Sequence, residues 1–80
     1  MNITYPPQAV INKITGIVYV KFVIDKKGKV VDVEAVRPVD PLLDKEAIRV
    51  VKSSPKWKPG KNNGVEVNVI HTVPVKFQIM

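Results

Sequence analysis

The clearest pattern in the chain is the alternation of apolar and polar positions near its C-terminus. Apolar side chains occupy nearly every second position over residues 65–79, with His71 in the same register, and mostly polar residues lie between them. An alternation with period two is typical of a β-strand that buries one face. The pattern therefore predicts one long final strand, with Ile70 and Pro74 as exceptions on its polar face.

An earlier hairpin is predicted over residues 17–36. Residues 17–24 carry apolar side chains on both faces, which is typical of a central strand. The sequence Asp-Lys-Lys-Gly over residues 25–28 supplies a turn, and residues 29–36 return as a second strand. The apolar positions expected on one face of that strand are Val31, Val33 and Ala35, with Asp32 and Glu34 on the solvent face. Residues 63 and 64, Asn-Gly, predict a further tight hairpin turn just before the final strand.

Two segments have helical spacing. Residues 6–14 open with a proline pair, which suits the first turn of a helix, and Val10, Ile11 and Ile14 would share one face. A second helix is predicted to end at Lys52 and to begin either at Pro41 or at Asp44. Its cap is correspondingly Asp40 or Asp44. The stripe expected to be buried is Leu43, Ala47, Val50 and Val51.

This order of elements predicts an α+β fold for a single domain that spans residues 1–80. Its core is a three-stranded antiparallel sheet in the order 2-1-3, with two helices packed on one face. Proline donates no backbone hydrogen bond, so Pro74 places the last strand at the edge of the sheet. Because the chain has no cysteine, apolar burial must hold the fold together.

The chain is basic, with 13 Lys and Arg against 7 Asp and Glu and a net charge of +6. Such an excess favours acidic partners, among them anionic lipid heads, polyanionic cell-wall material and nucleic acid. The lysines are spread along the chain, and arginine occurs only at Arg37 and Arg49. Base recognition favours arginine and exposed aromatic residues, so a nucleic-acid partner is not expected.

The residue types that catalysis needs are nearly absent. The chain has one histidine, no cysteine, and serines only at Ser53 and Ser54. His71 falls on the apolar face of the last strand, where a half-buried structural histidine is expected. Trp57 is interpreted as a packing residue in the same way. We therefore expect no enzymatic activity, no metal site and no cofactor.

Taken together, these segments resemble the C-terminal domain of the TonB family, over nearly the whole chain. The resemblance is carried by Tyr5-Pro6, Gly16 with residues 18–22, residues 25–30, Leu43-Asp44 with Ala47, Ile48 and Val51, residues 57–60, Gly64 and residues 73–77. TonB-like proteins are anchored in the inner membrane beside a proton-driven motor complex and cross the periplasm through a proline-rich linker. Their terminal domain engages the TonB box, a peptide of outer-membrane transporters for siderophores, cobalamin, haem or glycans. The resemblance implies a periplasmic energy-transducing module, here a fragment without the anchor and linker.

The last strand suggests how such a domain binds a peptide. If Pro74 faces the open edge, the backbone groups of Asn68, Ile70 and Thr72 face it too, because backbone direction alternates along a strand. An open edge accepts an extended peptide as an additional strand. The predicted peptide-binding residues are Tyr5, Pro6, Pro7, Asn68, Ile70, Thr72, Pro74 and Lys76.

Other interpretations stay open at this stage. The same fold could serve as a cell-wall-binding or sensor domain of a membrane-bound signalling protein, since its basic charge suits anionic peptidoglycan. A small basic nucleic-acid binder is a third and weaker hypothesis. The edge that accepts a peptide could also accept a second copy of the chain, which would give a strand-exchanged homodimer.

Overall fold

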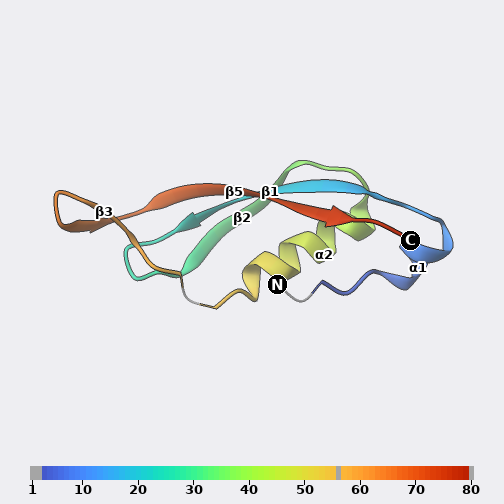
Figure 1. The fold of residues 1–80 in the computed structure, drawn as a ribbon, viewed down its shortest axis with the longest axis horizontal. Coiled ribbons are helices and arrows are strands. Elements are labelled where there is room, and N and C mark those ends of the chain that lie inside the picture. The colour runs from blue at the N-terminus through green and yellow to red at the C-terminus, as the bar shows by residue number, and fades with distance from the viewer. Residues whose placement is uncertain (1–2, 56, 80) are drawn as a thin grey trace.

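The structure is a computed structural model that describes residues 3–55 and 57–79. Three strands form an antiparallel sheet in the order β2-β1-β5, and β3 pairs with β4 in a separate two-stranded ribbon (Figure 1). The elements are α1 (Pro7–Ile11), β1 (Gly16–Ile24), β2 (Val30–Arg37), α2 (Pro41–Lys52), β3 (Gly60–Asn62), β4 (Val65–Val67) and β5 (Val69–Phe77). This confirms the predicted α+β class, the central position of the first strand and the edge position of the last one.

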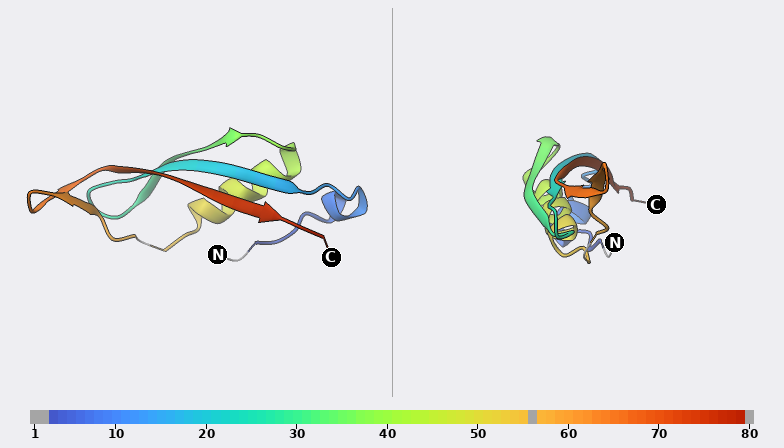
Figure 2. Two further views of the ribbon diagram at one scale, coloured as in Figure 1. Left: turned by 45° about the horizontal axis from the view of Figure 1, so that its top comes forward. Right: turned by 90° about the vertical axis from the view of Figure 1, so that its left-hand side faces the viewer.

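The core lies between the sheet and α2, and both helices lie on the same side of the sheet (Figures 1 and 2). Alternate side chains of β1 face α2 and are buried there, and β5 adds Val75 and Phe77 to this layer. The molecule is elongated, with extents of 49 × 20 × 19 Å, because the β3–β4 ribbon extends the sheet at one end. The buried side chains of β1 are Val18, Val20, Phe22 and Ile24.

The long final strand that the alternation predicts is divided in two at Asn68. Ile24, the last residue of β1, pairs with Val69, so the chain before Val69 has no partner in β1. That chain pairs instead with β3 across the predicted Asn-Gly turn, whose two residues have φ values of 53° and 77°. Positive φ at both central residues is what a tight type I′ hairpin requires. The turn is therefore confirmed, and β3 is an additional strand.

A β-bulge in β2 changes which of its residues face the core. Lys21 pairs with Glu34 but Val23 pairs with Val31, so one residue of β1 lies opposite two of β2. The additional residue is Asp32, which has φ 53°. A bulge shifts the alternation by one position. The prediction that Val31 shares a face with Val33 and Ala35 was therefore wrong. Val31 pairs with Val23 on the uncovered face of the sheet. The residues of β2 that pack against the core are Val30, Val33 and Ala35.

The first helix is shorter than its sequence pattern suggests, and its predicted apolar face was wrong. It ends at Ile11, and the chain then turns through Lys13, which has φ 53°. A helix of five residues cannot align positions 10, 11 and 14 on one face. Ala9 is buried instead, while Val10 is 43% and Ile11 72% exposed. Ile14 alone of the predicted set packs against the core.

The second helix begins at Pro41, which decides between its two predicted starts. The Asp40 carboxylate accepts the Leu42 N–H at 2.9 Å and caps the first turn. Asp44 accepts the N–H of Val39 at 3.0 Å and holds the preceding loop. The predicted buried stripe is confirmed, and Glu46 is a buried polar residue that the pattern did not indicate.

Glu46 fastens the N-terminal segment to α2. Its carboxylate accepts the Thr4 N–H at 2.7 Å and pairs with the Arg49 guanidinium at 2.6 Å. The hydrogen bond from Arg49, together with that from Thr4, lowers the pKa of Glu46, although burial acts to raise it. An ionised carboxylate is thus one of the groups that hold the N-terminal segment on α2.

We expect Glu46→Gln to destabilise the domain by about 1 kcal/mol at pH 7. Glutamine still offers an oxygen to the Thr4 N–H, so the loss is that of the charge on the acceptor. The ion pair with Arg49 adds little, because Arg49 is half exposed, at 51%. Because the folded pKa is lowered from 4.5, the carboxylate contributes fully above that value and loses its contribution as pH falls through the folded pKa. Urea unfolding of both proteins at neutral and at strongly acidic pH measures this. The difference in free energy of unfolding between the wild type and Glu46→Gln should be smaller at acidic pH. An equal difference at the two pH values would contradict this role of the carboxylate.

Candidate functional site

The candidate site is the edge of the sheet formed by β5. Among residues 3–55 and 57–79, this strand pairs with β1 alone, through nine residue pairs without a register shift. The opposite edge strand, β2, has two register shifts, and Asp32 and Glu34 on it are exposed. Bulges and charged side chains disfavour the addition of another strand. Of the two edges, β5 is therefore the one suited to pairing.

Pro74 defines which backbone groups of β5 are available at this edge. It pairs with Tyr19 of β1. In an antiparallel ladder, pairs that exchange hydrogen bonds alternate with pairs whose backbone groups point outward. Proline has no N–H, so the Tyr19–Pro74 pair belongs to the second kind. By the same alternation, the backbone groups of Ile70, Thr72 and Lys76 also point to the open edge.

The side chains of the same four β5 residues lie on the face of the sheet that the helices leave uncovered. All four are exposed, and Ile70 is 64% exposed. Their neighbours across the ladder on β1 extend this surface, and the Arg37 guanidinium lies 5.6 Å from the centre of the Tyr19 ring. The surface beside the edge is therefore part apolar and part basic. The cross-strand pairs are Ile17 with Lys76, Tyr19 with Pro74, Lys21 with Thr72 and Val23 with Ile70.

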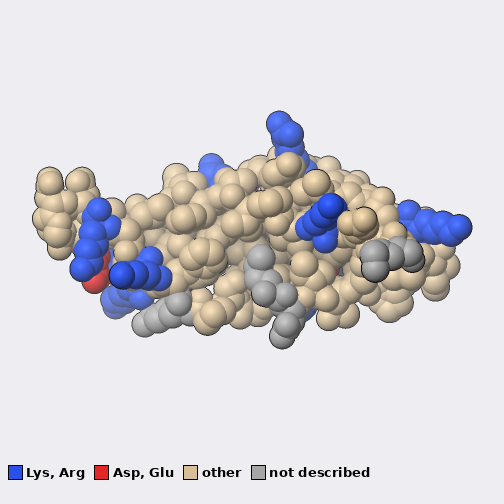
Figure 3. All heavy atoms as spheres, in the orientation of Figure 1, with Lys and Arg blue, Asp and Glu red and all other residues tan. Residues whose placement is uncertain are grey.

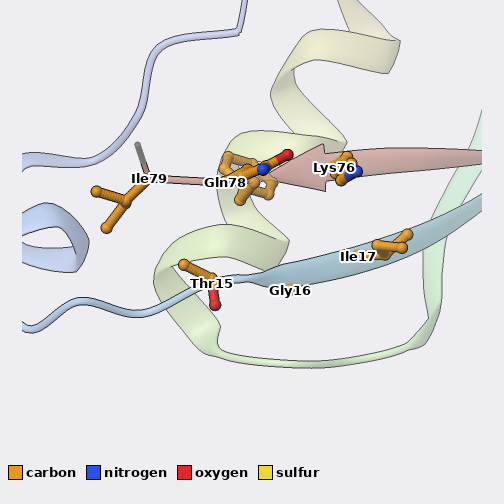
Figure 4. Close-up of a pocket in the computed structure, with 7 residues that line it drawn as sticks. Thr15, Gly16, Ile17, Lys76, Gln78 and Ile79 are labelled. Carbon is orange, nitrogen blue, oxygen red and sulfur yellow. The ribbon is translucent and has the colours of Figure 1, made fainter.

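A pocket of about 330 Å³ lies where the β1–β5 ladder ends (Figure 4). Gly16 and Ile17 from the start of β1 lie on one side of it, and Gln78 and Ile79 follow β5 on the other. Lys76 is the only residue of this pocket among those predicted as binding residues. The pocket depends on the register that pairs Gly16 with Phe77, which the sequence pattern alone does not specify. The described residues that line it are Thr15, Gly16, Ile17, Lys76, Phe77, Gln78 and Ile79.

The predicted N-terminal residues divide between two places. The Tyr5 ring meets Phe77 of β5 edge-on, with centroids 5.4 Å apart, and the Tyr5 hydroxyl donates to the Ile14 carbonyl. Tyr5 is thus both a packing residue and a neighbour of the end of β5. Pro6 and Pro7 instead line a pocket of about 340 Å³ against α2, together with Thr4, Leu42, Lys45, Glu46 and Arg49.

The remaining predicted residues are placed as follows. Asn68 is exposed and lies one position before β5 begins. The His71 ring stacks on Phe22 at 5.9 Å and lies 5.7 Å from Trp57. His71 and Trp57 are thus packing residues, as the sequence analysis expects. In the described part of the chain, no group of three or more His, Cys, Asp or Glu residues could hold a metal ion.

These features define a small α+β domain with one regular, accessible edge strand. The family model of the Gram-negative bacterial TonB protein C-terminal matches residues 1–79, and the chain belongs to this family. It is a periplasmic, transport-associated family of non-enzymatic domains, with a role in TonB-type energy transduction to outer-membrane transporters. Comparisons with curated proteins and with solved structures gave no match. Among the helices in residues 3–55 and 57–79, none is long and apolar enough to cross a membrane.

Proposed function

We propose that this domain captures the TonB-box peptide of an outer-membrane transporter by β-strand addition along β5. Family membership supports an outer-membrane transporter as the partner. The observation that carries the mode of capture is the regular, unpaired edge of β5, on which Pro74 directs its backbone outward. In the full-length protein, an inner-membrane anchor and a proline-rich linker would connect this domain to the proton-driven motor complex.

Recognition in this mode rests mainly on the backbone. Ile70 and Thr72 each offer an N–H and a C=O to the incoming strand, whereas Pro74 offers only its C=O. Main-chain pairing gives affinity that tolerates different peptide sequences, which suits a module that serves several transporters. Selectivity comes from the side chains of Ile70, Thr72 and Lys76 beside the new strand. The gap at Pro74 limits continuous pairing to one part of the edge.

Tyr5 and the pocket at the end of the ladder extend the site beyond Pro74. The contact between Tyr5 and Phe77 holds the N-terminal segment close to the end of β5. The adjoining pocket, lined in part by Ile17 and Ile79, has the volume to accept one apolar side chain of the peptide. Pro6 and Pro7 contribute indirectly, because their pocket faces α2 and not the open edge.

An NMR titration of the ¹⁵N-labelled domain with a synthetic TonB-box peptide tests the proposal. Amide shifts are expected to concentrate at Ile70, Thr72 and Lys76. The matched control is the same peptide with N-methyl groups on alternate residues, which keeps every side chain but removes the N–H groups that face β5. Equal binding of the methylated peptide would refute strand addition, and no binding of either peptide would refute the transporter role.

A further inference from the structure

A second surface of the molecule is a cluster of lysines at the end that carries β3 and the β1–β2 turn. We call this surface the basic end. The backbone N–H of Trp57 donates to the Gly28 carbonyl at 2.8 Å and so joins the segment before β3 to that turn. Figure 3 shows Lys and Arg side chains gathered close to this end. The residues of the basic end are Lys26, Lys27, Lys29, Lys58 and Lys61.

The lysines of the basic end carry a net positive charge that is open to solvent. All five are exposed, and in the described part of the chain none of them takes part in an ion pair. The acidic residues beside them are Asp25 and Glu66. The Asp25 carboxylate accepts the backbone N–H groups of Lys27 and Lys29, each at 2.9 Å, and Glu66 lies opposite Lys61. Five positive charges against two negative ones leave about half of the chain's net charge of +6 at one end.

The side chains of the basic end indicate which kind of ligand suits it. Three pockets in the described part of the chain are lined by residues of the N-terminal segment, of α2 and of the ends of β1 and β5, and none of these three includes a lysine of the basic end. Sugars commonly stack on an aromatic ring, but the Trp57 ring packs against Phe22 and His71 and is held in the core layer. The basic end is itself a set of flexible point charges on the β1–β2 turn and on the neighbouring segment that leads into β3. Such a set fits an extended array of phosphate groups.

We propose that the basic end binds the surface of a membrane that contains anionic phospholipids. Each lysine held near such a surface contributes favourably, and the contributions accumulate over a cluster. Val65, at the turn of the β3–β4 ribbon, is 64% exposed and adds an apolar contact at the same end. The basic end and the Gly16–Phe77 end of the ladder lie at opposite ends of a molecule 49 Å long (Figure 1). Membrane contact therefore leaves the pocket and the adjoining part of β5 accessible, and it does not depend on the proposed peptide capture.

Co-sedimentation with lipid vesicles tests this proposal. The wild-type domain is expected to bind vesicles of phosphatidylcholine mixed with phosphatidylglycerol, but not phosphatidylcholine alone, and to bind more weakly as salt is added. The triple variant Lys27→Gln, Lys29→Gln, Lys58→Gln should lower the partition coefficient by about a hundredfold, since each lysine contributes roughly fivefold. The matched control is Lys13→Gln, Lys45→Gln, Lys52→Gln, which removes the same charge elsewhere.

The partition coefficient of the control variant is expected to fall by less than about threefold. Its lysines lie too far from the membrane surface for its electrostatic potential to act on them strongly. Circular dichroism checks that both variants are folded. Equal losses in the two variants would overturn the proposal, because binding would then follow net charge alone. Absence of binding to anionic vesicles at low salt would also overturn it. So would binding to insoluble peptidoglycan without binding to vesicles, since the partner would then be a glycan.

Discussion

Replacing Thr72 with proline is expected to weaken peptide binding by about tenfold or more while the domain stays folded. The Thr72 N–H points to the open edge in the register of β5, so its loss removes no bond to β1. Pro74 already occupies the equivalent position two residues further on. In the complex, however, one carbonyl of the peptide would lose its donor and be covered without a hydrogen bond. The dissociation constant from isothermal titration calorimetry measures the effect.

Thr72→Val is the matched control for this substitution. Valine keeps the backbone N–H and the β-branched shape and removes only the hydroxyl group. We expect it to bind the peptide within about threefold of the wild type, because it retains every main-chain bond. If Thr72→Pro bound as tightly as wild type, the edge of β5 would not be the site of capture. If Thr72→Val lost as much as Thr72→Pro, the side chain and not the backbone would be what the peptide recognises.

Replacing Phe22 with alanine is expected to cost about 3 to 5 kcal/mol of the free energy of unfolding. Phe22 of β1 is fully buried, and its ring contacts both Trp57 and His71. A domain of this length has a total stability on the order of 4 to 12 kcal/mol, so the substitution removes a large part of it. Urea unfolding followed by tryptophan fluorescence measures the loss, since Trp57 reports on the same cluster.

Ile11→Ala is the contrasting substitution. The helical spacing of the sequence would place Ile11 in the core, where its truncation costs about 2 to 5 kcal/mol. In the structure Ile11 is 72% exposed, so we expect a change within about 0.5 kcal/mol. A large loss for Ile11→Ala, or a small one for Phe22→Ala, would contradict the described core.

The sequence predicts the fold well where a single pattern runs through a whole element. The alternation in β1 and the stripe on α2 identify most of the core, and Pro74 identifies the edge strand. The failures lie where the backbone departs from a regular period. The positive φ of Asp32 moves Val31 to the other face, and the positive φ of Lys13 ends a helix that the apolar spacing would continue. Neither residue is a glycine, so the residue types do not indicate a positive φ at these positions.

The candidate site was predictable only in its backbone part. The alternation rule and the missing N–H of Pro74 are enough to derive which groups of β5 face outward. The pocket at Gly16 and the hydrogen bond from Thr4 to Glu46 depend on contacts between residues far apart in the chain. Sequence periodicity carries no information on such contacts. The same applies to the basic end, which is assembled by the bond between Trp57 and Gly28.

Amide hydrogen exchange at β5, with and without bound peptide, shows whether the peptide is captured by strand addition. In the free domain, the amides of His71 and Val73 bond to β1 and should exchange slowly, while those of Ile70 and Thr72 should exchange fast. Saturating peptide should lower the amide exchange rates of Ile70 and Thr72 by about tenfold or more and change those of His71 and Val73 little. If Ile70 and Thr72 stayed fast in the bound state, or were already protected in the free monomer, capture by strand addition along β5 would be contradicted.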